Sequence, residues 1–188
     1  GALTARHVGV DPASHAVWFK RVLEAAGAPV CPTPDPCLLP KARKNAIEQA
    51  GMRAAHLRDG VAICRFLHWL DTQGQGCTEL EAVARLEAFR AEHPLYRGDS
   101  FPTISGSGPN GAIIHYRVTK QSDRRLGENE VYLCDSGAQY PDGTTDITRT
   151  VWTGPGTPPD ALRATFTRVL KGNLTLGHVV SPAGSTRP

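Results

Sequence analysis

The 188-residue chain lacks the features of a membrane protein and of a disulfide-stabilised protein. No stretch approaches the roughly 20 consecutive apolar residues that a membrane-spanning helix needs. Its five cysteines are an odd number without regular spacing, and no Cys-x-x-Cys pair is present. Neither a disulfide framework nor a structural zinc site is therefore indicated. Unpaired thiols are typical of a reducing compartment, so we expect a cytoplasmic protein.

The chain also lacks a concentrated basic region. Lys and Arg number 21 against 18 Asp and Glu, and the formal net charge is +3. A nucleic-acid-binding protein more often carries a clustered basic stripe, so no nucleic-acid partner is expected. The glycine-rich segment 105–111 has no Gly-Lys-Ser or Gly-Lys-Thr sequence and predicts a turn rather than a phosphate loop.

Acidic residues become scarce toward the end of the chain. No glutamate follows Glu130, and His178 is the only histidine after His115. The first residue is glycine rather than methionine, and residues 181–188 have the composition of a loop. We therefore expect the chain to be a piece of a longer protein.

Proline marks a division near the beginning of the chain. Asp11-Pro12 predicts the start of a helix over residues 12–26. Residues 28–40 contain five prolines and predict neither helix nor central strand. We place a domain junction there, which makes residues 1–40 the tail of a preceding domain with its linker, and residues 41–188 the start of a second domain.

The second part predicts two helices, then strands, then a helix. Asn45 with Glu48, and Thr78 with Glu81, have the spacing of capping boxes, and apolar residues follow both at helical intervals. Segments rich in β-branched and aromatic residues then predict strands over 101–105, 112–117, 130–134 and 144–153. With a last helix over 158–179, the fold class is α+β.

Two aspartates flank a predicted β-hairpin. Pro141-Asp142-Gly143 is a turn signal. A hairpin centred between Tyr140 and Pro141 places Asp135 directly opposite Asp146, where Cβ atoms lie about 4.5–5.5 Å apart. Two carboxylates so close repel unless a cation lies between them. Hard oxygen ligands of this kind suit Mn²⁺, Mg²⁺ or Ca²⁺, and also Zn²⁺ or Co²⁺ when histidine joins them.

The alternative is that both acids are exposed residues beside a turn. Asp135 follows the apolar run 131–134 and Asp146 precedes Ile147, which argues against that alternative because an unpaired charge at the edge of a buried strand is costly. A bulge at Gly143 would shift the register by one residue. Thr148 shares the face of Asp146, so its hydroxyl is a candidate for orienting a metal ligand.

Three segments, residues 101–116, 135–140 and 142–150, together resemble the Xaa-Pro aminopeptidases (aminopeptidase P). The looser match runs from about Asn45, through Arg58-Asp59-Gly60-Val61, to Gly172. The resemblance implies the N-terminal part of the pita-bread fold, which prolidase, creatinase and methionine aminopeptidase share, preceded by the tail of another domain.

The resemblance also implies a site with two divalent metal ions, usually Mn²⁺, held by two Asp, one His and two Glu. Asp135 and Asp146 match the two aspartate positions. His115 matches a histidine that is not a metal ligand but assists substrate binding and proton movement around the tetrahedral intermediate. The other three ligand positions have no counterpart in this chain, so we expect these 188 residues alone to be inactive.

The implied activity is release of the first residue from peptides with proline at the second position, by attack of a metal-bridging hydroxide, in a homodimer. Two alternatives stay open. One is a non-catalytic pita-bread module that binds a peptide or a partner. The other is a related hydrolase such as a prolidase-like dipeptidase; creatinase works without metal, so the aspartate pair argues against a creatinase-like enzyme.

Overall fold

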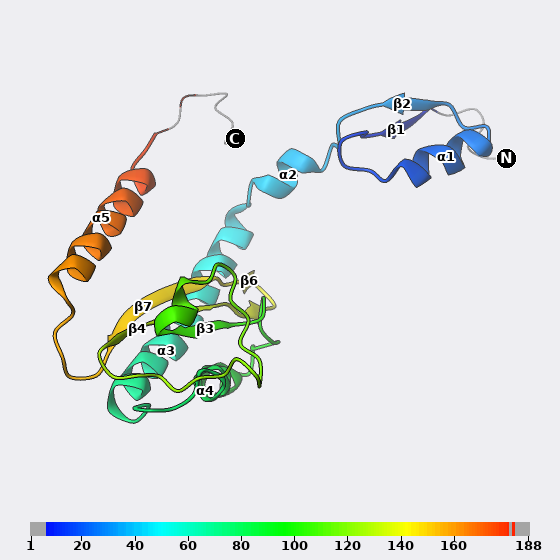
Figure 1. The fold of residues 1–188 in the computed structure, drawn as a ribbon. Coiled ribbons are helices and arrows are strands. Elements are labelled where there is room, and N and C mark those ends of the chain that lie inside the picture. Colours follow the sequence, from blue (N-terminus) through cyan, green and yellow to red (C-terminus); the bar gives the residue numbers. More distant parts are fainter. Residues whose placement is uncertain (1–6, 181, 183–188) are drawn as a thin grey trace. The chain divides into compact units, whose positions relative to one another are not determined.

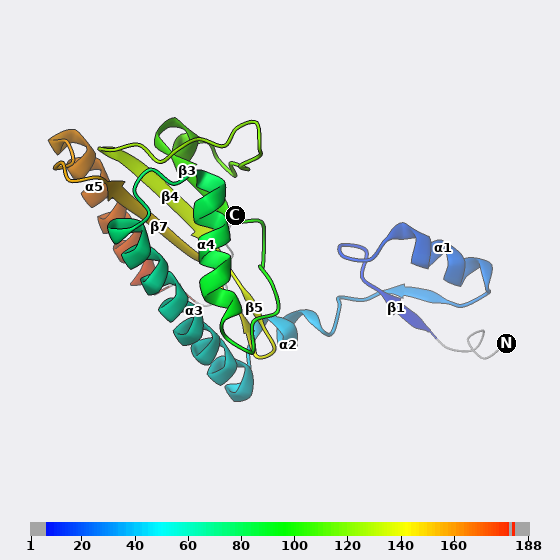
Figure 2. The same cartoon turned by 90° about the horizontal axis from the view of Figure 1, so that it is seen from below.

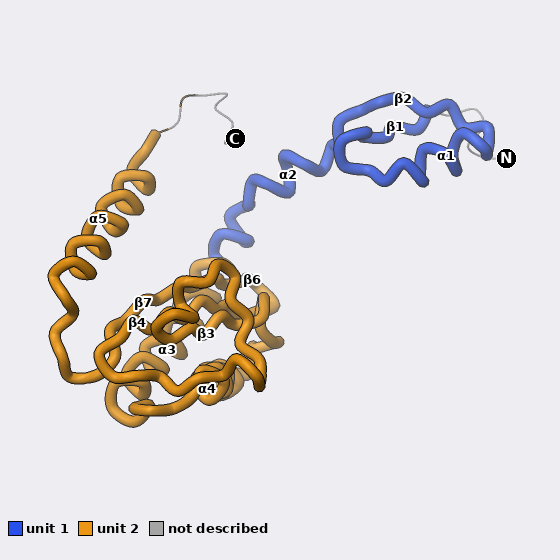
Figure 3. Tube along the Cα trace, viewed as in Figure 1, with its two compact units in different colours: residues 1–50 blue, residues 51–188 orange. Residues whose placement is uncertain are grey.

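The computed structural model describes residues 7–180 and 182, and the chain divides into two compact units, residues 1–50 and 51–188 (Figure 3). The boundary between them in the sequence falls within helix α3 (Ala46–Thr72). The assignment of residues 1–40 to a preceding domain stays a prediction.

The first unit contains a small parallel sheet and two helices. Strand β1 (Val8–Val10) pairs with β2 (Val30–Pro32), and α1 (Val17–Ala25) connects them. Helix α2 (Leu38–Ala42) follows. Strand β2 agrees with the prediction that residues 28–40 contain no central strand, because both strands of a two-stranded sheet are edges, where proline is tolerated. The prediction that these residues contain no helix is wrong at 38–40, where α2 begins; Pro40 lies in its first turn, where an amide has no partner within the helix.

Helix α1 begins later than its sequence predicts. The expected start at Pro12 is wrong by five residues, since α1 begins at Val17. The carboxylate of Asp11 accepts a hydrogen bond from the amide of Ala13 at 2.9 Å, and its carbonyl accepts one from the amide of His15 at 2.9 Å. These bonds close a separate turn over residues 12–14, as aspartate often does ahead of a helix.

The second unit is built on one three-stranded antiparallel sheet, in the order β3 (Ile104–Ser107), β4 (Glu130–Ser136), β7 (Ile147–Thr153). Helices α3 and α4 (Glu79–Ala91) lie across one face of this sheet (Figure 2). Both predicted capping boxes are present, with bonds of 2.8 and 2.9 Å at the first helix and 2.7 and 3.2 Å at the second.

Each helix buries one stripe against the sheet. The buried residues of α3 recur at three- and four-residue intervals, and they are Ala55, Asp59, Ala62, Ile63, Phe66 and Leu70. Those of α4 are Glu79, Ala82, Leu86 and Arg90. Along β4 the buried residues alternate and are Tyr132, Cys134 and Ser136. Asp135, which lies between the last two, therefore occupies the sheet face that points away from the helices.

Four further elements belong to the unit (Figure 1): a 3₁₀ helix, η1 (Gly108–Ala112), the short strands β5 (Gln139–Tyr140) and β6 (Gly143–Thr144), and helix α5 (Asp160–Gly177). The last helix confirms its prediction. None of its residues is buried.

The strand predicted over 112–117 is wrong. These residues complete η1 and then form a turn, and they pair with no strand. Pro109 cannot donate to a ladder, and the side chains of Asn110 and Tyr116 instead bind a buried carboxylate beneath the segment. The α+β class is confirmed. No helix within residues 7–180 is both long and apolar enough to span a bilayer.

Candidate metal centre

The register of the β4–β7 ribbon differs from the predicted one. Asp135 is paired with Thr148 and Ser136 with Ile147, so the predicted direct opposition of Asp135 and Asp146 is wrong. At the tip, Tyr140 pairs with Gly143. The turn therefore consists of residues 141–142, and its centre lies one residue further along the chain than predicted. Each residue of the first strand is accordingly paired with the residue two positions beyond its predicted partner.

A shift of two positions leaves each side chain on its predicted face, because side chains alternate with a period of two. Ile104, Asp135 and Thr148 form a row across the three strands. Asp146 precedes Thr148 by two residues, just outside β7. Asp135 and Asp146 accordingly line the same cavity, whose volume is about 410 Å³.

The cavity combines these carboxylates with one imidazole, one guanidinium and an apolar wall. Its lining residues are Phe101, Pro102, Ile104, His115, Arg117, Asp135 and Asp146. Asp135 is half-buried, whereas Asp146 and His115 are exposed. In the described part of the chain, no ion pair joins Arg117 or another cationic side chain to either aspartate.

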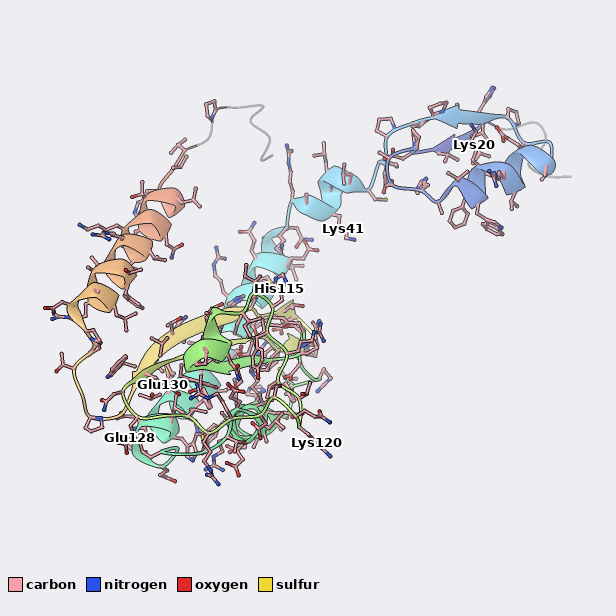
Figure 4. All side chains as sticks on the ribbon, viewed as in Figure 1. Lys20, Lys41, His115, Lys120, Glu128 and Glu130 are labelled. Carbon is pink, nitrogen blue, oxygen red and sulfur yellow. The ribbon has the colours of Figure 1, made fainter. Side chains whose placement is uncertain are left out.

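His115 lies on the loop that follows η1, where it is labelled in Figure 4. Its backbone has φ of 53°, in the left-handed region that a residue with a Cβ rarely adopts. The next residue, Tyr116, is buried. The histidine ring is thus presented at the cavity by a sharp backbone turn.

Thr148 donates a hydrogen bond from its hydroxyl to Oδ1 of Asp135, at 2.7 Å. A carboxylate has about four acceptor positions, so this bond orients Asp135 without saturating it. Such a bond fixes a potential ligand in place, as hydrogen bonds around metal sites do.

The donor set at the cavity fits part of a metal site. Two carboxylates supply the hard oxygen atoms that Mn²⁺ and Mg²⁺ prefer. Within residues 7–180 and 182, however, no group of three or more His, Cys, Asp and Glu side chains is placed to hold a metal ion. Asp135 and Asp146 would therefore need ligands beyond those that the described residues provide.

A buried ion pair supports the ribbon from the helix side. Arg90 donates from Nε to Oδ1 of Asp59 at 2.7 Å and from Nη2 to Oδ2 at 3.0 Å, and both side chains are fully buried. The same guanidinium donates to the hydroxyl of Ser136 at 3.0 Å and to the carbonyl of Gly137 at 3.3 Å. Thr145 donates to Oδ2 of Asp59 at 2.6 Å.

This network fixes the backbone beside both aspartates, since Ser136 follows Asp135 and Thr145 precedes Asp146. Our sequence analysis did not find the network. A signal for it exists, because Asp59 and Arg90 each occupy a position on the apolar stripe of their helix. A charged residue in such a stripe is rarely buried unless it is paired.

Comparisons with known proteins show which sequences and folds this chain resembles. The sequence pattern described as metallopeptidase family M24 matches residues 50–187. An Xaa-Pro aminopeptidase of Drosophila melanogaster is 49% identical over 150 residues, which is 78% of this chain and 24% of that protein. Xaa-Pro aminopeptidase 2 of Sus scrofa is 47% identical over 154 residues, 80% of this chain and 22% of that protein. The chain thus spans about a quarter of the length of these relatives.

Solved structures resemble it as well. The X-prolyl aminopeptidase of Caenorhabditis elegans, described as a cytosolic enzyme with a di-nuclear active site, matches with a TM-score of 0.72 and 34% identity, over 84% of this chain and 29% of that one. A prolidase of Pyrococcus horikoshii matches with a TM-score of 0.76 over 96% of this chain and 50% of that one, at 21% identity, and so supports the fold alone.

Proposed function

Because this chain belongs to metallopeptidase family M24 and has the mixed helix and strand structure of the pita-bread fold, we propose that the complete protein is a metal-dependent aminopeptidase. It releases the first residue from peptides that have proline at the second position. The observation that carries the proposal is the shared cavity of Asp135, Asp146 and His115. The relatives from fly and pig, both named as Xaa-Pro aminopeptidases, support the choice of substrate.

Asp135 and Asp146 would hold two divalent ions, together with ligands from outside the described residues. The di-nuclear site named for the Caenorhabditis elegans enzyme supports this number of ions. We propose Mn²⁺, with Zn²⁺ or Co²⁺ as alternatives. Two divalent metal ions bound side by side would lower the pKa of a water molecule between them and polarise the scissile carbonyl. These 188 residues alone supply too few ligands and would be inactive.

The chain's own residues orient the substrate and stabilise developing charge. His115 donates a hydrogen bond to the substrate oxygen as negative charge builds on it. Thr148 keeps the Asp135 carboxylate in one orientation through its 2.7 Å hydrogen bond. Phe101 and Ile104 give the cavity an apolar wall. That wall suits a pyrrolidine ring, and the peptide nitrogen of proline carries no hydrogen that would need an acceptor.

We propose that the complete enzyme is a homodimer and that it acts in the cytoplasm. Free thiols at all five cysteines support a reducing compartment, and the Caenorhabditis elegans enzyme is described as cytosolic.

Metal analysis and peptide cleavage by the complete protein test the function. Asp135→Asn and Asp146→Asn should each lose bound metal and activity, whereas His115→Ala should retain metal and lose most of its turnover. Asp142→Asn is the matched control, because Asp142 lies at the tip of the same ribbon, where it pairs with Arg58 outside the cavity. Full metal content in Asp135→Asn would contradict the proposed site.

The substrates separate the remaining candidates. An Xaa-Pro-Xaa tripeptide should be cleaved, and an Xaa-Pro dipeptide should not. The opposite preference would indicate a prolidase-like dipeptidase. Weak Mn²⁺ binding without cleavage of either peptide would indicate a non-catalytic binding module.

A further inference from the structure

Glu79 is a buried carboxylate without a cationic partner. It is the first residue of α4, and its side chain is fully buried. In the described part of the chain no Lys, Arg or His lies within ion-pairing distance of it. Burial of an unpaired charge is costly unless hydrogen-bond donors surround it, and the positive end of α4 offsets only part of that cost.

The donors that satisfy Glu79 all come from residues 107–116. The amide of Ser107 donates to Oε1 at 2.8 Å, and Nδ2 of Asn110 lies 3.0 and 3.1 Å from the two carboxylate oxygens. The hydroxyl of Tyr116 donates to Oε2 at 2.9 Å. One side chain thus holds both ends of the segment that carries His115.

Apolar packing holds only the end of this segment, where the ring of Tyr116 is buried. Ile113 and Ile114, which directly precede His115, are 54% and 86% exposed and contribute little to packing. The left-handed backbone of His115 costs about 1–2 kcal/mol and persists only where the surroundings determine it. A backbone hydrogen bond from the amide of Tyr116 to the carbonyl of Ile113, at 3.2 Å, closes the turn around His115, and the bonds of Asn110 and Tyr116 to Glu79 fix that turn to helix α4.

We propose that Glu79 is a positioning residue for His115. Through Asn110 and Tyr116 it holds the loop in the conformation that presents the imidazole to the cavity. This inference rests on the proposed function, in which His115 acts on the substrate. Glu79 itself does not line the cavity and is not a metal ligand.

Glu79→Gln tests the proposal with a side chain of the same shape. The amide retains one acceptor for Ser107, but its NH₂ group then opposes Nδ2 of Asn110, which can only donate. The hydroxyl of Tyr116 would accept from the new NH₂ group and donate instead to the carbonyl of Ser122, 3.2 Å away. We expect kcat/KM of the complete protein to fall by about tenfold to a hundredfold, as for the loss of a hydrogen bond to a charged group. Metal content should stay unchanged.

Glu81→Gln is the matched control. It removes the same charge from the same helical turn, but the side chain of Glu81 caps the amide of Thr78 at 2.7 Å and does not contact the loop. Activity should stay within about twofold, because glutamine also completes a capping box. If Glu79→Gln does not fold, Tyr116→Phe removes only the loop's hydroxyl and serves instead.

A double-mutant cycle separates positioning through His115 from a general structural role. In a His115→Ala background, Glu79→Gln should lower kcat/KM by less than about twofold, since the residue it positions is already gone. An undiminished loss in that background, a loss of metal, or no effect of Glu79→Gln in the parent would overturn the proposal.

A measurement without substrate distinguishes failure of this inference from failure of the proposed function. In NMR spectra of the 188-residue chain, Glu79→Gln should shift the backbone ¹³Cα signal of His115, which reports φ, and Glu81→Gln should not. If the complete protein cleaves no peptide but this shift appears, the function is wrong and the positioning is right. If cleavage occurs and the shift is absent, the positioning is wrong.

Discussion

Replacement of Arg90 by methionine should lower the free energy of unfolding of the second unit more than substitution of an exposed charged residue does. The substitution retains apolar volume but removes the guanidinium that bonds Asp59, Ser136 and Gly137. Asp59 would stay fully buried with Thr145 as its remaining donor. Breaking a buried pair in this way costs roughly 3–5 kcal/mol, because a charge is left without a partner.

Urea unfolding of the chain measures this loss of unfolding free energy. With an m-value of about 2 kcal/mol/M, a loss of 4 kcal/mol lowers the midpoint by about 2 M. Trp69 packs against the core of the second unit and reports its unfolding by fluorescence. A Trp18→Phe background removes the tryptophan of the first unit. The two units need not unfold together.

Two further variants test whether the unpaired buried charge of Asp59 causes the loss of stability. Asp59→Leu combined with Arg90→Met removes both charges and should recover about 2 kcal/mol of the loss. Arg65→Met, which breaks the exposed pair with Glu92, should leave the midpoint almost unchanged. Our reasoning would be refuted if Arg90→Met lowered stability by less than about 1 kcal/mol, or if the double variant were no more stable than the single one.

Three other predictions concern single side chains. Thr148→Val should weaken Mn²⁺ binding by the complete protein about 10–100-fold in calorimetry, because Asp135 loses its orienting hydroxyl; equal affinity would exclude that role. Burial acts to raise the pKa of Glu130, but its hydrogen bonds and the charge of Arg124 outweigh burial and lower it. This carboxylate therefore stabilises the fold above its unfolded pKa of about 4.3, and the stability is lost as pH falls through the lower folded value. Glu130→Gln should flatten the dependence of the urea midpoint on pH below about 4, and an unchanged slope would contradict this assignment. Burial raises the pKa of Cys134 to about 11, so at pH 8 its thiol should react with a disulfide reagent only after unfolding.

Helices α3, α4 and α5 and the faces of the strands could be predicted from the sequence because local rules determine them. The capping boxes at Asn45 and Thr78 fix where α3 and α4 begin, and the alternation along β4 fixes which way Asp135 points. The register could not be predicted, because the turn lies one residue from the expected centre and turn signals do not resolve that difference.

Long-range polar contacts explain the other errors. Residues 112–117 have the composition of a strand, but the bonds of Asn110 and Tyr116 to Glu79 hold the segment in a turn. Those partners lie 31 and 37 residues apart in the sequence, which is beyond the reach of propensity or periodicity. The pairing of Asp59 with Arg90 is non-local in the same way.

The hydrogen-bond network around Arg90 has a consequence for how the chain folds. Its partners lie 31, 46 and 47 positions away, and Thr145 joins Asp59 across 86 residues. During synthesis the network cannot be completed before Thr145 has left the ribosome, and contacts between residues so far apart in the sequence form slowly. Until then only the ion pair of Asp59 with Arg90 can form, and the two helices lack the bonds to Ser136, Gly137 and Thr145 that attach them to the ribbon carrying both aspartates.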